Sequence, residues 1–372
     1  MDEFRDGHAA RALAAEIAAV VQPDRQYRMM EFCGGHTHIF AIACYGLSAL
    51  LPDNVTEKLI HGPGCPVCAA DWPLDGAIAP GAGTRRDLVH VRRHPARARF
   101  RAHELVQGAG GWRRCAHGVF GDDALALARA ELQRQVVFFA IGFETTTPPT
   151  ALALLTARAE GLSNFSVYAN HAVTPAVMRH LLASGDGVAL DGFIGPSHVS
   201  TVIGSDAYAD IARDSGKPVV ITGFEPLDVL IGVRMLIEQI NQGRAEVENQ
   251  FIRAVTATGN RKARQVVDEV FALRPAFDWR GLGEVVASAL AIRPEWSAWD
   301  AEVKFGLTTH SVADNKACEC GAILQGRKKP QDCKVFATVC TPDNPLGACM
   351  VSSEGACAAH YAYGRFVSKE PA

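Results

Sequence analysis

The sequence lacks a long hydrophobic run, a large net charge and the pattern of a signal peptide. Its longest apolar stretch, residues 39–51, is too short to cross a bilayer, and residues 1–8 lack a basic segment followed by an apolar one. The 372 residues are 48% hydrophobic with a net charge of -3, as in an ordinary globular protein. We therefore expect a cytoplasmic protein with no nucleic-acid and no membrane partner.

Cysteine, by contrast, is concentrated near the C-terminus, where six of the 11 cysteines fall within 40 residues. Cys318, Cys333, Cys340 and Cys357 are separated there by 14, 6 and 16 residues. Thiolates are the usual ligands of iron–sulfur clusters, and a cluster can replace the apolar core that a domain of about 70 residues cannot supply. Zinc is the main alternative, but zinc ligands usually come in close pairs, and only Cys320 lies close to Cys318. Unrelated buried cysteines fit this concentration poorly. The spacing favours a [4Fe-4S] cluster.

A second cysteine pair, Cys65 and Cys68, stands in the segment His-Gly-Pro-Gly-Cys-Pro-Val-Cys. Such a pair at a Gly/Pro turn can close a small disulfide, and these motifs often lower the thiol pKa enough to form a redox couple. An isolated pair is also half of a zinc site, although no second pair with zinc-like spacing follows. An odd number of cysteines in a reducing compartment favours ligands and redox-active thiols over a disulfide framework. We interpret the pair as a redox-active dithiol.

Cys33 opens a third motif, Cys-Gly-Gly-His-Thr-His, at the point where a strand is expected to lead into a helix. Glycines permit close approach of the backbone, and a thiol beside a helix N-terminus and histidines gains thiolate character and metal affinity. The alternative is a buried structural cysteine, as we interpret Cys44 on the same helix. The motif favours Cys33 as a metal ligand or nucleophile, with His36 beside it.

Apolar runs suited to β-strands alternate with helix-forming segments, which is the pattern of an α/β fold. Strands are expected at residues 27–32, 136–141, 165–169, 192–194 and 219–222. Helices are expected at residues 9–21, 36–50, 149–158, 175–183, 227–241 and 261–272. The pattern is interrupted near residues 293–300 by Pro294 and two tryptophans. We predict two α/β layered domains with mostly parallel sheets, residues 1–135 and 136–297, and a small iron–sulfur domain, residues 298–372.

Polar residues follow three of the expected strands. Glu144 begins the run Glu-Thr-Thr-Thr-Pro, His171 follows Asn170, and His198 lies in Gly-Pro-Ser-His-Val-Ser. Open α/β sheets bind ligands at the carboxyl ends of their strands, so Glu144 and His198 are candidate site residues, although the threonines suit a helix cap equally well. Neither G-x-x-x-x-G-K-[ST] nor G-x-G-x-x-G occurs, so no nucleotide site is expected.

Taken together, these motifs closely resemble the HypD family of hydrogenase maturation factors. The resemblance extends over most of the chain and rests on residues 33–38, 62–68, 142–148, 191–200, 222–226 and 350–357. It implies two α/β domains and a C-terminal [4Fe-4S] domain. It also implies a role in building the Fe(CN)2CO group of [NiFe]-hydrogenases, together with a HypC-type small chaperone and a HypE-type cyanide donor.

By the same resemblance, Cys33 would hold the iron under assembly with a cysteine of the HypC-type partner. Cys65 and Cys68 would be the redox dithiol, and the four C-terminal cysteines would bind the cluster. The chain would then be a redox-active scaffold for assembling a metal centre. A free-standing iron–sulfur disulfide reductase acting on a thioredoxin-like partner would use the same parts but would not need Cys33. A zinc-stabilised binding protein is a third alternative.

One stretch, residues 69–121, departs from the family pattern because the expected apolar strands are missing. Residues 85–114 hold nine arginines against two acidic residues, a local charge of +7. A basic loop that binds nucleic acid or an acidic partner is one interpretation, but only Phe100 and Trp112 supply interleaved aromatic rings. A short out-of-frame translation of a GC-rich gene accounts better for the excess of Arg, Ala, Gly and His. We place no site residue in this stretch.

Overall fold

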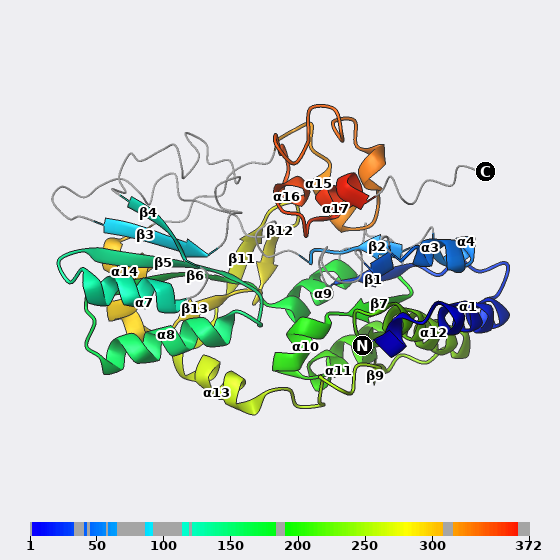
Figure 1. Cartoon of the computed structure of the whole chain (residues 1–372), viewed down its shortest axis with the longest axis horizontal. Helices are drawn as coiled ribbons and strands as arrows, with labels where there is room; N and C mark the ends of the chain where they lie inside the picture. The colour runs from blue at the N-terminus through cyan, green and yellow to red at the C-terminus, as the bar shows by residue number, and fades with distance from the viewer. Residues whose placement is uncertain are drawn as a thin grey trace. The chain divides into compact units, whose positions relative to one another are not determined.

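The computed structural model describes residues 2–32, 41–42, 45–56, 59–64, 86–91, 114–118, 121–183, 190–307 and 315–363. The chain divides into two compact units, each assembled from separate segments (Figure 1). Unit 1 comprises Met1–Cys68, Val177–Asn260 and Lys316–Ala372, and unit 2 comprises Ala69–Ala176 and Arg261–Asn315. This division differs from the three consecutive ranges expected from the sequence, because distant segments contribute strands to the same sheet.

Unit 1 is built on a five-stranded sheet in which all neighbouring strands are parallel. The strands, in their order across the sheet, are β2 (Leu59–His61), β1 (Met29–Glu31), β7 (Gly192–Gly195), β8 (Val219–Ile221) and β9 (Val247–Asn249). β1, the first strand of the chain, thus lies between β2 and β7. The direction in which successive strands are added therefore reverses between β1 and β7.

Two long helices cover one face of this sheet. α1 (Gly7–Val20) packs alongside α12 (Pro226–Gln242), as Figure 1 shows. Their apolar sides bury Met29, Ile194 and Val220 in a shared core. The shorter helices of this part of the chain are η1 (Asp2–Arg5), α3 (Leu47–Leu50), α4 (Asp53–Thr56), α9 (Thr174–Ala183), α10 (Ser197–Ile203), η2 (Asp206–Tyr208) and α11 (Ala209–Ser215).

Unit 2 contains a second parallel sheet, of four strands, and two antiparallel pairs. The parallel strands, in their order across the sheet, are β4 (Arg114–Gly118), β3 (Arg86–Val91), β5 (Gln135–Gly142) and β6 (Phe165–His171). The antiparallel pairs are β10 (Phe271–Leu273) with β13 (Leu290–Ile292) and β11 (Ala276–Trp279) with β12 (Gly283–Val286). The helices are α7 (Gly121–Ala130), α8 (Thr147–Ala159), α13 (Arg261–Val270), η3 (Pro294–Trp299) and α14 (Ala301–Phe305). The core joins α7, α8, β5 and β6, and includes buried Trp296 from η3.

Short helices make up the C-terminal part of unit 1, which we call the cysteine module (residues 316–363). They are α15 (Cys320–Leu324), η4 (Pro330–Asp332), α16 (Ala348–Val351) and α17 (Ala356–Tyr363), and they gather together in Figure 1. The module packs against β2, since a Cβ on Gly326 would lie 2.9 Å from two side-chain carbons of Ile60. Among the described residues, no helix has the length and hydropathy needed to cross a membrane.

The predicted α/β pattern with mostly parallel sheets is confirmed, because each predicted strand overlaps an observed one. The prediction of one continuous helix over residues 36–50 is wrong at Gly46. This glycine adopts the left-handed conformation, with φ of 64°, and a separate helix, α3, begins after it. The antiparallel pairs were not predicted, and the division between the units falls after Asn315, later than the interruption near residues 293–300.

Two strands lie inside the stretch 69–121 that departs from the family pattern. β3 pairs with both β4 and β5, so that Val89 lies opposite Ala116 on one side and Phe138 on the other. The expectation that this stretch lacks strands is therefore wrong for residues 86–91 and 114–118. Its other residues up to 120 lie outside the described ranges, and the frame slip stays a prediction.

Candidate functional site

Four cysteines that form no disulfide line one cavity in the cysteine module: Cys318, Cys333, Cys340 and Cys357. Cys333, Cys340 and Cys357 are buried, whereas Cys318 is partly exposed. The space not filled by protein atoms, open solvent at its mouth included, is about 260 Å³. Apolar side chains complete its lining: Ile323, Val335, Phe336 and Met350. The tertiary structure thus brings together the four cysteines that the sequence singles out.

These cysteines need a positive charge among them if they are to be thiolates. Burial raises the pKa of the Cys357 thiol, and negative charge on Cys318, Cys340 and Cys333 raises it further. A bound cation reverses this effect, because a thiol that coordinates a metal is deprotonated. The donor set and its burial fit a metal centre held by thiolates.

Two kinds of metal centre take four cysteine ligands, a single zinc ion and a [4Fe-4S] cluster. A zinc ion draws four ligands to one point, with sulfur at about 2.3 Å. Within the described ranges, no three His, Cys, Asp or Glu side chains gather in a way that could hold a single metal ion. The irons of a [4Fe-4S] cluster occupy separate corners, and each takes its own cysteine. A cavity lined by four cysteines offers the number of ligands that such a cluster takes, and binding of the cluster stays a prediction.

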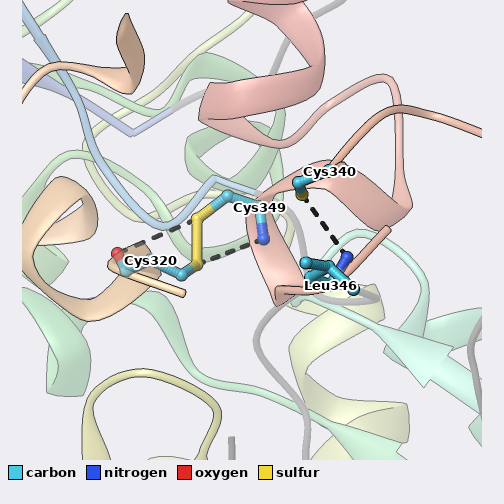
Figure 2. The surroundings of a disulfide bond; sticks show 4 residues. All are labelled: Cys320, Cys340, Leu346 and Cys349. Carbon is cyan, nitrogen blue, oxygen red and sulfur yellow. Dashed lines mark hydrogen bonds between the residues drawn. A yellow bond between two sulfur atoms is a disulfide. The ribbon is translucent and has the colours of Figure 1, made fainter. Parts of the chain in front are cut away.

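Two backbone features suit the cysteines to this position. Gly347 leaves room for Cys318, because a Cβ at Gly347 would lie only 2.0 Å from the Cys318 Sγ. The backbone N–H of Leu346 donates to the Cys340 Sγ over 3.4 Å (Figure 2). Hydrogen bonds to the ligand sulfurs are one of the means by which a protein sets the reduction potential of a cluster.

A disulfide between Cys320 and Cys349 lines the same cavity (Figure 2). Both residues are buried, and the backbone N–H of Cys349 donates to the Cys320 Sγ over 3.2 Å. No disulfide was predicted for this pair, and a single disulfide does not amount to the disulfide framework that the sequence disfavours. The two positions are 29 apart in the sequence, and this spacing carries no signal that they meet.

The cysteine module also lies close to the end of β2, the strand that leads toward Cys65. The pKa of His360 on α17 is lowered by burial and then by the nearby His61, the last residue of β2. The His61 Nδ1 lies 3.1 Å from the Oε1 of Glu31, which is buried at the end of β1. Polar side chains therefore connect the ends of β1 and β2 with the helix that carries Cys357.

Four predicted site residues, Cys33, His36, Cys65 and Cys68, lie outside the described ranges. The chain leaves β1 still paired with β7, because the Phe32 N–H donates to the Ile194 carbonyl over 3.3 Å. The strand order reverses between these two strands, and open parallel sheets bind ligands at such switch points. Cys33 follows Phe32 in the sequence, so the strand order adds support to its prediction.

His198 lies in the first turn of α10, directly after β7, and is exposed. Its ring centroid is 4.2 Å from that of Phe224, which follows β8. Phe224 meets the edge of Phe251 at 5.9 Å, and the Arg253 guanidinium lies 4.4 Å from the centre of the Phe251 ring. The carboxyl edge of the sheet in unit 1 thus carries a row of rings in tilted and edge-to-face contact, and His198 is the ring that follows β7 in that row.

Glu144 belongs to unit 2, where it follows β5 and is buried. Its carboxylate accepts hydrogen bonds from the N–H and the hydroxyl of Thr174, at 2.8 and 2.9 Å, where α9 begins. Burial raises the pKa of Glu144 to about 7, although these hydrogen bonds lower it. The contacts show a structural role at the start of α9, and a catalytic role for Glu144 stays a prediction.

His171 follows an expected strand in the sequence but was not predicted to be a site residue. The structure buries it completely at the end of β6, and burial lowers its pKa to about 3. Its Nε2 lies 3.0 Å from the Thr150 hydroxyl. Its Nδ1 has no hydrogen-bond partner within the described part of the chain. His171 is therefore neutral at pH 7, and only its position at a strand end could have drawn attention to it.

We expect Glu144→Gln to gain stability relative to the unsubstituted protein as pH rises. The pKa is about 7 in the folded state and near 4.5 when unfolded, so the folded state binds the proton more tightly. The unsubstituted protein therefore loses stability as Glu144 ionises, and the variant does not. This loss is absent below pH 4.5, grows up to about pH 7 and amounts to at most about 3 kcal/mol. Denaturant unfolding at about pH 5 and about pH 8 measures it.

The matched control is Glu160→Gln, also in unit 2. The Arg129 side chain lowers the pKa of Glu160, so this variant should show no gain at high pH. Equal effects of Glu144→Gln at both pH values would show that Glu144 is already ionised at the lower one.

Fold and site together define an α/β protein of two parallel-sheet units with a cysteine-lined module. A family model named HypD, described as "Hydrogenase formation hypA family", matches residues 8–364. The "Hydrogenase maturation factor HypD" of Azotobacter vinelandii is 56% identical over 376 residues, which cover 98% of this chain and 97% of the relative. Its namesake in Rhizobium leguminosarum bv. viciae is 54% identical, with coverage of 99% and 96%. The namesake in Escherichia coli (strain K12) is 41% identical, with coverage of 91% and 90%. The chain belongs to the HypD family.

Proposed function

We propose that this chain is a [NiFe]-hydrogenase maturation factor that acts as a redox-active scaffold for assembling the Fe(CN)2CO group. One observation carries the proposal: four cysteines that form no disulfide line a cavity in a module that packs against the strand leading to Cys65. Membership of a family whose members are named hydrogenase maturation factors supports the biological role.

In this proposal Cys318, Cys333, Cys340 and Cys357 hold a [4Fe-4S] cluster, which supplies one-electron chemistry when bound. The surrounding residues of the chain provide its environment. Ile323, Phe336 and Met350 restrict access of water to the cavity, and the Leu346 N–H donates to one ligand sulfur. The nearby Cys320–Cys349 disulfide can take up two electrons and two protons to become two thiols.

Cys33 is the proposed ligand of the iron under assembly, which it shares with a cysteine of a HypC-type small chaperone. A HypE-type protein delivers cyanide to that iron. Cys65 and Cys68 supply two electrons and release two protons when they oxidise to a disulfide. The position of β1 at the switch point of the sheet supports Cys33 for this role.

Infrared spectroscopy of the protein purified anaerobically with a HypC-type partner tests the assignment of Cys33. We expect bands from iron-bound CO and cyanide in the complex, and their loss in Cys33→Ala because the iron then lacks its ligand on this chain. Iron bound by the C-terminal cysteines should remain. Cys44→Ala, a cysteine interpreted as structural, is the matched control. Undiminished bands in Cys33→Ala would contradict the scaffold proposal.

The alternative function is a free-standing iron–sulfur disulfide reductase, and the buried disulfide beside the four cysteines is the observation that favours it. Such a reductase would act on a thioredoxin-like partner and would retain full activity without Cys33. The same Cys33→Ala variant therefore separates the two functions.

We expect the double variant Cys65→Ala/Cys68→Ala to lose hydrogenase maturation in cells while its fold is retained. The Gly and Pro residues around the pair predict a turn that would allow conversion between thiols and disulfide with little backbone movement, and alanine removes both sulfurs. Hydrogenase activity in a strain that carries only the variant is the readout, and circular dichroism checks the fold. Full hydrogenase activity would exclude a redox role for the pair.

A further inference from the structure

The first half of the cysteine module carries positive charge, in contrast to the chain as a whole. Residues 315–334 contain five basic residues and two acidic ones, whereas the whole chain has a net charge of -3. The five basic residues are all exposed, and we call them the basic rim: Lys316, Arg327, Lys328, Lys329 and Lys334.

Members of the basic rim lie beside the most accessible cysteine of the cavity. Of the four cysteines that line the cavity outside the disulfide, Cys318 is partly exposed and the other three are buried. Lys316 stands two residues before it, and Lys328 pairs with Glu319, the residue after it. Lys334 directly follows a buried cysteine of the same cavity. Members of the rim therefore lie within two residues of Cys318 and Cys333 in the sequence, and Lys328 reaches the residue beside Cys318 through an ion pair.

The disulfide in this cavity is shielded from direct attack by a thiol in the solvent. Cys320 and Cys349 are 3% and 1% exposed, and thiol exchange requires a thiolate to reach a sulfur atom. Reduction to two thiols consumes two electrons and two protons. A partner that delivers electrons one at a time needs no contact with the sulfurs, and water can supply the protons.

We propose that the basic rim docks an acidic protein that carries single electrons, of the ferredoxin or flavodoxin kind. The inference rests on the proposed function, because it takes Cys318 as a ligand of a redox centre. Each docked carrier gives up one electron and is itself oxidised. Two such events, with two protons from water, convert the Cys320–Cys349 disulfide into two thiols.

Two physical features suit this partner. Opposite charges steer association and raise its rate, which benefits a complex that has to form and separate repeatedly. An apolar contact is also available, because Tyr361 is 43% exposed and its ring packs at 6.3 Å on Phe336, a residue of the cavity lining.

Calorimetric titration of the full-length protein with a small acidic [2Fe-2S] ferredoxin tests the docking surface. We expect Lys316→Glu/Lys334→Glu to weaken binding by about tenfold at low salt and to reduce the dependence of affinity on salt. The matched control is Arg261→Glu/Lys262→Glu, which makes the same charge change at exposed positions of α13 and should leave the affinity unchanged.

Absence of binding by the unsubstituted protein, or equal losses in both double variants, would overturn the docking proposal. Iron and sulfide analysis of the same samples separates this result from the proposed function. If the protein contains no iron but still binds ferredoxin through the basic rim, the cluster assignment is wrong and the docking proposal stands. If the protein contains iron but the rim substitutions do not change its affinity for ferredoxin, the docking proposal is wrong and the cluster assignment stands.

Discussion

Replacing any one of Cys318, Cys333, Cys340 and Cys357 with alanine is expected to remove most of the iron and to loosen the cysteine module. We expect about four irons per chain and a brown colour in the unsubstituted protein, and less than about one iron in each variant. The helices of the module are short, and a bound cluster would supply much of what holds them together, so its loss should expose them to proteolysis. Iron and sulfide analysis, visible absorbance and limited proteolysis measure these effects.

The control for this series is Cys320→Ser/Cys349→Ser, because these cysteines line the same cavity but are joined to each other. This variant should keep its iron. It should nevertheless lose about 3 kcal/mol of stability, since the disulfide closes a loop across 29 positions. Stoichiometric zinc without visible absorbance, or full iron content in the four single variants, would rule out the cluster assignment.

The second large effect is expected from Gly347→Ala, a substitution that adds one methyl group and removes no ligand. The new Cβ would lie 2.0 Å from the Cys318 Sγ, a separation that the two atoms cannot adopt. Cys318 would have to move away from the cavity, and we expect iron content to fall by at least half even though all four cysteines remain. Anaerobic iron analysis and visible absorbance measure this loss.

Gly7→Ala provides the matched control, because it makes the same change elsewhere in unit 1. A Cβ there would meet only the Arg11 Nη1, at 3.6 Å, which is an ordinary contact. This variant should therefore keep its iron and its stability. Normal iron content in Gly347→Ala would show that Cys318 is not held in its observed position when the metal is bound.

The sequence alone was sufficient to predict the layered α/β architecture. Strands of a parallel sheet are buried on both faces, so they appear as continuous apolar runs such as residues 136–141, and β5 and β6 were found where expected. The sequence also singled out the four C-terminal cysteines that line one cavity, because their number and concentration are typical of cluster ligands. Their role as ligands stays a prediction. Gly46 shows the limit of this reasoning, since helix-forming neighbours do not reveal where one glycine will adopt a left-handed conformation.

Only the tertiary structure decided which distant residues meet. The order of strands across the two sheets, and hence the switch point between β1 and β7, depends on how segments far apart in the chain pair. The joining of Cys320 to Cys349, the burial of Glu144 against Thr174 and the close approach of Gly347 to Cys318 all arise from packing. The sequence specifies which residue types occur and how far apart they are along the chain. Disulfides, buried hydrogen bonds and steric fit depend instead on distances in space that exist only after the chain has folded.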